Sequence, residues 1–386
     1  MSRIINLILN SCHGISLTLV SFTLPIIVIT IGLNGSTELI AEISLIHSLI
    51  FLIYFPLSGN ARNYLLNSSD VTLNLAITNF RIILFLPLTL FCFLVNEITL
   101  KIELTKFALF TLIGSFFWFY EIFITNYEKK RKFIACIFFL FANIFIFTTI
   151  LLQRNNSSED IILSLTFYCI LYIPFILYFF FTYNKKIDFQ TLNLIFKKKI
   201  YHHIGGSLII GLTSFLIKIL IVTVYQKEDA GNIFLGFTLG GTLVTFFSYG
   251  IGPSILKYFK NKKITSFKTH KTIFVLTLTL ALIFMLNETF EIARLKNLNY
   301  LFYYSFYFSI IGCLFMLIAQ YYKLLITQKD TKLNVIKHEL IIGFTTITFV
   351  MLSSFSEYSF TITLTYFISA ITSYIIYNSV YQNINK

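Results

Sequence analysis

The chain alternates between long apolar stretches and short polar connections. Twelve stretches of about 20 mostly apolar residues occur along it, and each is long enough to cross the hydrocarbon core of a bilayer as a helix. The pattern therefore predicts an all-α polytopic membrane protein. The predicted spans are residues 6–31, 39–58, 74–95, 104–125, 133–152, 161–183, 203–225, 231–256, 272–290, 300–326, 335–353 and 358–379.

The amino-acid composition agrees with this pattern. Of the 386 residues, 56% are hydrophobic and only 12% are charged, and the mean hydropathy is +0.79. Soluble domains carry about twice that share of charged residues. The five cysteines all lie inside apolar stretches at no metal-ligand spacing, so we interpret them as core residues and expect no disulfide bonds.

Basic residues are distributed unevenly between the two sides of the predicted helices. With a cytoplasmic N-terminus, 23 of the 30 Lys and Arg residues fall on the cytoplasmic side and 6 on the outer side, while Lys218 lies within a span. Cytoplasmic loops of membrane proteins are enriched in positive charge, so both termini are predicted to be cytoplasmic. The net charge of +13 follows mostly from this topology, and no nucleic acid is expected as a partner.

The longest cytoplasmic connection divides the twelve spans into two groups of six. Its cations alternate with apolar residues, which is typical of a segment on the membrane surface. The second span ends in "FPLSGNARNYLLNSS" and the eighth in "FSYGIGPSILKYFKNKK", each with a glycine followed by a basic tail. This echo favours parallel repeats, although any two helix exits can look alike. The predicted parts are an N-terminal half (1–183), an amphipathic linker (184–202) and a C-terminal half (203–386) around a central cavity.

Polar residues of the seventh span gather on one face of the predicted helix. At 100° per residue they fall within about 60° of one another. Lys218, at the centre of this face, has no acidic residue nearby in sequence, and an ammonium near the bilayer centre costs about 2.5–3.5 kcal/mol. We interpret the face as the lining of a water-filled cavity, and the alternative is packing of its small residues against another helix. The face consists of Ser207, Gly211, Ser214, Lys218 and Tyr225.

The first, second and eighth spans carry similar polar faces. In the eighth span, Thr238 and Gly241 begin a face that is equally compatible with helix packing. In the first two spans the histidines can be satisfied inside the bundle, and the arginine can anchor the cytoplasmic end of its helix. The candidate cavity residues of these two spans are Asn10, His13, His47, Tyr54 and Arg62.

Other polar and aromatic residues have structural interpretations. Arg81 and Glu121 both fall toward the cytoplasmic ends of adjacent spans, so an ion pair between them is predicted. A row of tyrosines follows the outer start of the tenth span. The row predicts an aromatic belt at the membrane surface, and stacking against sugars is the alternative. Its members are Tyr300, Tyr303, Tyr304 and Tyr307.

Motifs of enzymes are missing from the sequence. It contains no phosphate-binding glycine loop, no HExxH zinc motif, no GxSxG nucleophile elbow and no zinc constellation. The chain is therefore predicted not to be an enzyme, and no cofactor or metal is expected.

The architecture resembles that of the multidrug/oligosaccharidyl-lipid/polysaccharide (MOP) superfamily. The stretches "STELIAEISLIHSLIFLIYFPLSGNARNYLL" (36–66) and "EDAGNIFLGFTLGGTLVTFFSYGIGPSILKYF" (228–259) are similar to the first hairpin of each half in polysaccharide exporters. The short length, basic character and Lys-, Ile- and Asn-rich composition resemble Wzx-type O-antigen flippases. The resemblance covers the whole chain in architecture, through motifs of low specificity.

The resemblance implies a flippase of the bacterial inner membrane that moves an undecaprenyl-pyrophosphate-linked oligosaccharide by alternating access. It implies a cationic cavity, to which Arg62 and Lys218 would contribute, alongside Asn10, His13, His47, Tyr54 and Ser214. Expected partners are this lipid-linked oligosaccharide, membrane lipids, a polysaccharide polymerase and a chain-length regulator, and a monomer is expected. The alternatives are a membrane O-antigen polymerase or glycosyltransferase, and a drug exporter of the same superfamily.

Overall fold

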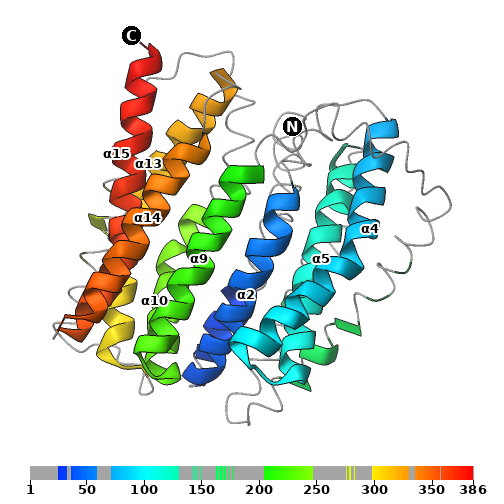
Figure 1. The fold of residues 1–386 in the computed structure, drawn as a ribbon, viewed down its shortest axis with the longest axis horizontal. Helices are drawn as coiled ribbons and strands as arrows, with labels where there is room; N and C mark the ends of the chain where they lie inside the picture. The colour runs from blue at the N-terminus through cyan, green and yellow to red at the C-terminus, as the bar shows by residue number, and fades with distance from the viewer. Residues whose placement is uncertain are drawn as a thin grey trace, which may run out of the picture. The chain divides into compact units, whose positions relative to one another are not determined.

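The computed structural model describes residues 25–32, 36–58, 71–129, 204–246, 298–329, 335–356 and 358–385, with scattered positions between 141 and 177 and between 275 and 282. Every regular element of these residues is a helix, which confirms the all-α prediction for this part of the chain. The long helices are α2 (Thr37–Ser58), α4 (Val71–Val95), α5 (Leu104–Lys129), α9 (Ile204–Val224), α10 (Lys227–Phe246), α13 (Tyr300–Lys329), α14 (Val335–Ser354) and α15 (Thr365–Asn385) (Figure 1).

Six apolar segments of the described residues are long enough to cross a membrane. These segments have the length and composition expected of a multi-pass membrane protein. Helices α5 and α10 are not among the six, although the sequence predicts a span at each. The first turn of α10 carries Glu228 and Asp229, which makes its described part less apolar. The six segments are Thr37–Leu57, Leu75–Leu100, Gly206–Val224, Tyr300–Ile326, Val335–Ser354 and Phe360–Ile384.

The chain forms two compact units. Unit 1 consists of Met1–Thr23 and Leu45–Phe215, and unit 2 consists of Leu24–Ser44 and Leu216–Lys386. Helices α2 and α9 each contribute residues to both units. Each unit is described by itself below.

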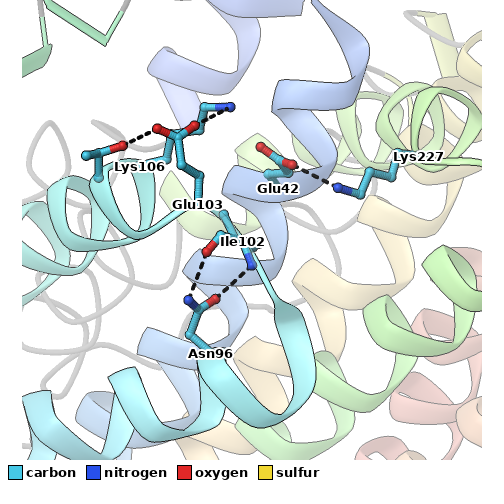
Figure 2. Close-up of polar contacts among 7 residues, drawn as sticks. Glu42, Asn96, Ile102, Glu103, Lys106 and Lys227 are labelled. Carbon is cyan, nitrogen blue, oxygen red and sulfur yellow. Dashed lines mark hydrogen bonds and ion pairs between the residues drawn. The ribbon is translucent and has the colours of Figure 1, made fainter.

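In unit 1, α4 and α5 form an antiparallel hairpin. The ring centroids of Phe85 and Phe119 lie 5.3 Å apart, and those of Phe93 and Phe107 lie 5.2 Å apart. The connection begins with a π-helical turn, η1 (Asn96–Leu100). The side chain of Asn96 closes this connection, because its amide donates to the carbonyl of Ile102 and its oxygen accepts from the Ile102 N–H, at 3.0 and 3.2 Å (Figure 2).

Helix α2 runs parallel to α5 within unit 1. A Cβ at Gly114 would lie 2.7 Å from the side chain of Ile50, and the rings of Tyr54 and Trp118 lie 5.1 Å apart. Residue numbers rise together along the two helices. The glycine at 114 thus allows α5 to pack closely against the middle of α2.

In unit 2, α10 and α13 pack in parallel through small residues. A Cβ at Gly236 would lie 2.6 Å from the Cβ of Ser305, and one at Gly240 would lie 2.3 Å from the Cβ of Ser309. Glycines four residues apart on one helix therefore face serines four residues apart on the other, which is the small-xxx-small contact of membrane helices. Gly241 lies on the predicted polar face of this span, and a Cβ at this position would lie 3.3 Å from the side chain of Tyr366 in α15.

Helices α13, α14 and α15 alternate in direction (Figure 1). The ring centroids of Phe315 and Tyr374 lie 5.7 Å apart and those of Tyr322 and Tyr381 lie 4.8 Å apart, so α13 and α15 run parallel. Helix α14 returns the chain between them. A 3₁₀ turn, η5 (Ser359–Leu364), precedes α15, which therefore begins at Thr365, later than the predicted start of the twelfth span at 358.

Candidate functional site

Lys218 of α9 is held by groups that carry no negative charge. Its Nζ donates a hydrogen bond to the backbone carbonyl of Ser44 at 2.9 Å. It also lies over the ring of Phe234, 5.8 Å from the centroid. Both partners belong to unit 2 together with Lys218. No carboxylate of the described residues forms an ion pair with this lysine.

The magnitudes explain why a charged lysine is tolerated there. Inserting an ammonium near the bilayer centre costs about 2.5–3.5 kcal/mol. A hydrogen bond to a charged group contributes about 1.5–3 kcal/mol, and a cation–π contact contributes about 0.5–2 kcal/mol. Cost and gain are similar in size, so Lys218 remains in the bundle without an acidic partner. An ammonium has three N–H donors, and the Ser44 carbonyl takes one of them.

The small residues beside Lys218 include a close helix contact. A Cβ at Gly211 would lie 2.7 Å from the Cα of Leu52, so within unit 1 the backbones of α9 and α2 approach directly at this point. Gly211 is therefore a packing residue, which is the alternative interpretation of the polar face. Ser214, one turn further along α9, is half-buried. The leucines at 208, 212 and 216 lie on the exposed face of the helix.

The predicted site residues on α2 have aromatic and hydroxyl neighbours in unit 1. His47 is half-buried, and its ring lies 6.5 Å from that of Phe51. Tyr54 is buried, and its hydroxyl lies 2.9 Å from the hydroxyl of Thr89. Because Thr89 donates its own proton to the carbonyl of Phe85, Tyr54 is the donor in this pair. These contacts bind α2 to α4 and leave the Tyr54 proton occupied.

Arg81 and Glu121 form the predicted ion pair, with Nη2 of Arg81 2.8 Å from Oε2 of Glu121. The arginine side chain is fully buried and also donates to the backbone carbonyl of Trp118. Its guanidinium lies 5.2 Å from the centre of the Trp118 ring. The Trp118 ring also contacts the ring of Tyr54. The sequence prediction is confirmed, and the pair has the additional partners that a buried charge requires.

Asn10, His13 and Arg62 lie outside the described residues. Their predicted place in a cavity stays a prediction. The described site residues Lys218 and Tyr54 are each engaged within their own unit, by Ser44 and Thr89 respectively.

A buried glutamate with two partners in unit 2, here called the Glu339 cluster, was not predicted from the sequence. Glu339 of α14 is buried, and its Oε1 lies 2.5 Å from Nζ of Lys323 in α13. The same oxygen accepts a hydrogen bond from the hydroxyl of Tyr377 in α15. The positive-inside interpretation counts Lys323 as one of the cytoplasmic cations and gives it no partner. The structure pairs it with a carboxylate of the adjacent helix. A signal was present in the sequence, since one acid in an otherwise apolar span requires a partner.

A second ion pair of unit 2 lies at the surface. Nζ of Lys227, at the start of α10, is 2.9 Å from Oε1 of Glu42 in α2 (Figure 2). The lysine side chain is 47% exposed and the glutamate side chain 15% exposed. Beside this pair, a Cβ at Gly231 would lie 1.9 Å from the carbonyl oxygen of Thr37. Helix α10 is thus packed closely against the beginning of α2.

The described part of the chain holds no candidate metal site, because no group of three His, Cys, Asp or Glu side chains there is placed to hold a metal ion. Cys92, Cys169 and Cys313 are buried free thiols.

No protein-family model matches the chain, and no curated protein sequence matches it. The resemblance to polysaccharide exporters accordingly rests on the residues quoted above.

Proposed function

We propose that the protein is a flippase that moves an undecaprenyl-pyrophosphate-linked oligosaccharide from the inner to the outer leaflet of the bacterial inner membrane by alternating access. The observation that carries the proposal is the uncompensated charge of Lys218. Its described contacts are a neutral carbonyl and an aromatic ring, so the positive charge stays available to an anionic group. Among the described residues, the Ser44 carbonyl takes one of its three N–H donors, which leaves two for pyrophosphate oxygens.

The directions of the described helices support the proposed twelve-span architecture of two six-helix halves. Helices α10 and α13 run parallel, so if both cross the membrane, the proposal needs a return crossing between them. The predicted ninth span at 272–290 would supply one return. The alternation of α13, α14 and α15 fits the predicted tenth, eleventh and twelfth spans in the same way. Together with the distribution of cations, this architecture would place both termini in the cytoplasm.

In this proposal a cation accompanies the head group at each depth of the membrane. Arg62 would meet the pyrophosphate at the cytoplasmic entrance and Lys218 would meet it further out, while Asn10, His13, His47, Tyr54 and Ser214 stay predicted cavity residues. A charged head group that crosses a bilayer unaided pays a large desolvation cost. A single lysine at each step lowers that cost without holding the substrate so firmly that release fails.

One observation favours a second candidate, a drug exporter of the same superfamily. Such exporters would use a buried carboxylate for cation coupling, and Glu339 is a buried carboxylate. Lys323 and Tyr377 already occupy this carboxylate, however, and it lies outside the polar faces of the first two helices of each half. The flippase is therefore the better supported proposal.

The short described connections, such as residues 101–103 and 225–226, offer no space for the large outer loop of a polymerase.

The proposal is tested by transport of a labelled lipid. The purified protein is reconstituted into vesicles with a fluorescent undecaprenyl-pyrophosphate disaccharide, and an impermeant reductant measures the fraction of label in the outer leaflet over time. We expect Lys218→Ala to slow exchange at least tenfold and Lys218→Arg to retain part of it, because charge matters more than shape. Lys337→Ala serves as the matched control, since Lys337 is an exposed lysine of α14.

The same variants are then examined in a deletion strain for surface polysaccharide. Normal exchange and normal surface polysaccharide in Lys218→Ala, at unchanged protein abundance, would contradict the proposed substrate contact. Lys218 would then be a structural residue that fastens α9 to α2.

A further inference from the structure

Four exposed aromatic rings of unit 2 form a connected series, here called the aromatic ledge. Tyr300 and Tyr304 lie on the first turns of α13, Phe360 lies in η5, and Tyr358 directly precedes η5. Successive ring centroids along Tyr300, Tyr304, Phe360 and Tyr358 are 6.3, 6.1 and 5.9 Å apart. The residues are 51%, 38%, 40% and 66% exposed in the same order. Rings from two separate elements thus form one continuous exposed surface.

The base of the aromatic ledge is held by a polar network at the start of α13. Asn299 caps this helix, because its side-chain oxygen accepts from the N–H groups of Leu301 and Phe302 at 3.1 and 3.4 Å. Its amide donates to Asp229 at 2.6 Å, and its backbone N–H donates to Asn232 at 3.3 Å. The first turn of α13 is therefore fastened to α10, which fixes the position of Tyr300.

A further tyrosine adjoins the ledge. Burial raises the pKa of the Tyr225 phenol, and the neighbouring Tyr300 hydroxyl and Asp229 carboxylate act in the same direction. Tyr225 therefore stays neutral at physiological pH and keeps a hydroxyl that can donate and accept. Polar hydroxyls and an amide–carboxylate pair thus border the exposed rings on the α10 side.

The level of the aromatic ledge relative to the membrane follows from the apolar segments. Tyr300 and Phe360 are each the first residue of a segment that could cross the membrane. The rings therefore lie where hydrocarbon gives way to water, as the rings of an aromatic belt do. A belt needs only that each ring sit at this level. The contact series adds a continuous surface of adjoining rings, each tilted against the next, that is bordered by hydrogen-bonding groups.

Saccharides match this combination of groups. A pyranose ring has a face of C–H groups that packs against an aromatic ring, and hydroxyls around its edge that need hydrogen-bond partners. Tyrosine supplies an apolar ring and a polar tip in one side chain. Four of the relevant residues, Tyr225, Tyr300, Tyr304 and Tyr358, are tyrosines, so the surface combines apolar rings with phenol hydroxyls.

We propose that the aromatic ledge binds the sugar rings of the saccharide head group at the membrane surface. This inference rests on the proposed function for the identity of its ligand. Pyranose C–H faces stack on Tyr300, Tyr304 and Tyr358, and sugar hydroxyls bond to the phenols. Lys218 engages the pyrophosphate and the ledge engages the glycan, so the two contacts recognise different parts of one substrate.

The test measures binding of free sugars to the full-length protein in lipid nanodiscs. The probes are methyl β-glucoside, methyl β-galactoside and N-acetylglucosamine, and saturation-transfer NMR reports which of their protons contact the protein. We expect transfer to the ring C–H protons of at least one probe. Replacing Tyr300, Tyr304 and Tyr358 together by leucine should weaken that binding roughly tenfold or more, because each lost stacking contact is worth about a factor of three to ten.

Leucine is chosen because it keeps these positions apolar, so anchoring at the membrane surface is preserved while the rings are removed. Phe344→Leu is the matched control, since this ring of α14 is 75% exposed and lies outside the ledge. Helix content by circular dichroism and a single gel-filtration peak establish that the triple variant is folded. Equal sugar binding by the folded triple variant and the control, or no binding by the unmodified protein, would overturn the inference and leave an aromatic belt only.

The two proposals fail in distinguishable ways. If Lys218→Ala transports normally while the ledge still binds sugars, the proposed pyrophosphate contact is wrong and the sugar site stands. If Lys218→Ala abolishes transport while no sugar binds the unmodified protein, the sugar site is wrong and the flippase proposal stands.

Discussion

Single residues set how closely the helices of unit 2 approach one another. A Cβ at Gly231 would lie 1.9 Å from the Thr37 oxygen and 2.6 Å from its carbonyl carbon. These are backbone atoms, which cannot rotate away as a side chain can. Gly241 on the same helix differs, because the nearest atoms to its Cβ would belong to the ring of Tyr366 at 3.3 Å. A side chain at Gly231 would thus collide with backbone atoms, whereas one at Gly241 would meet only a side chain.

We expect Gly231→Ala to destabilise the protein by about 1–3 kcal/mol, since overpacking outweighs the gain of about 1 kcal/mol in helix propensity. Gly241→Ala should be close to neutral, because the Tyr366 ring needs to shift only slightly. The measurement is the fraction of monomer that survives heating of the detergent-purified variants. A midpoint temperature of Gly231→Ala equal to that of Gly241→Ala would show that α10 and residue 37 are not in close contact.

At the scale of elements, two ion pairs of unit 2 join helices in different surroundings. The Lys323–Glu339 pair lies among α13, α14 and α15, and the lysine and glutamate side chains are 20% and 8% exposed. Tyr377 donates to the same carboxylate and, with Ile342 and Ile326, belongs to a buried apolar cluster. The Glu42–Lys227 pair joins α2 and α10 at the surface. Burial makes the loss of one partner costly only in the first case.

We expect Glu339→Leu to lower the free energy of unfolding by about 3–5 kcal/mol, because Lys323 is left charged and unpaired. The double variant Lys323→Leu/Glu339→Leu should recover much of this loss, since neither charge then remains buried. Lys227→Ala is the surface comparison and should cost about 0–1 kcal/mol. Thermal unfolding of the unmodified protein, Lys323→Leu, Glu339→Leu and the double variant completes a double-mutant cycle. Additive effects of the two leucine substitutions would exclude a direct pair.

The elements also show what the sequence can predict. Long apolar runs and short polar connections predict α2, α4, α5, α13 and α14 with ends within a few residues, because length and hydropathy are local properties. The Arg81–Glu121 pair was predictable because the two residues lie at matching depths of a hairpin. The Glu339 cluster was not, since its partners come from three helices whose rotation about their axes depends on packing. For the same reason, the sequence pattern of α9 did not show that Gly211 packs against another helix, because Gly211 and Ser214 lie on the same predicted polar face.

At the scale of the whole molecule, the directions of the helices constrain the path of the chain through the membrane. Within unit 2, α10 begins at Lys227. The hydrogen bond from Asn299 to Asp229 shows that the starts of α10 and α13 lie side by side. Helix α13 then runs for 30 residues, about 45 Å of helix, before α14 begins. Lys227 and Lys337 therefore lie at opposite ends of these helices. A membrane crossed by α13 has to separate them, whichever side each one occupies.

The distribution of cations predicts which side each residue occupies, and cysteine labelling tests it. The five native cysteines are replaced by serine or alanine, and single cysteines are introduced at Lys101, Lys227 and Lys337, which are all exposed. An impermeant maleimide applied to intact cells should label positions 101 and 227 but not 337, which should react only after the membrane is permeabilised. Labelling with the reverse pattern would contradict the predicted orientation and keep the crossing, because α13 still separates the two sides. Labelling of all three positions in intact cells would contradict the crossing itself, and with it every membrane direction assigned to α13, α14 and α15.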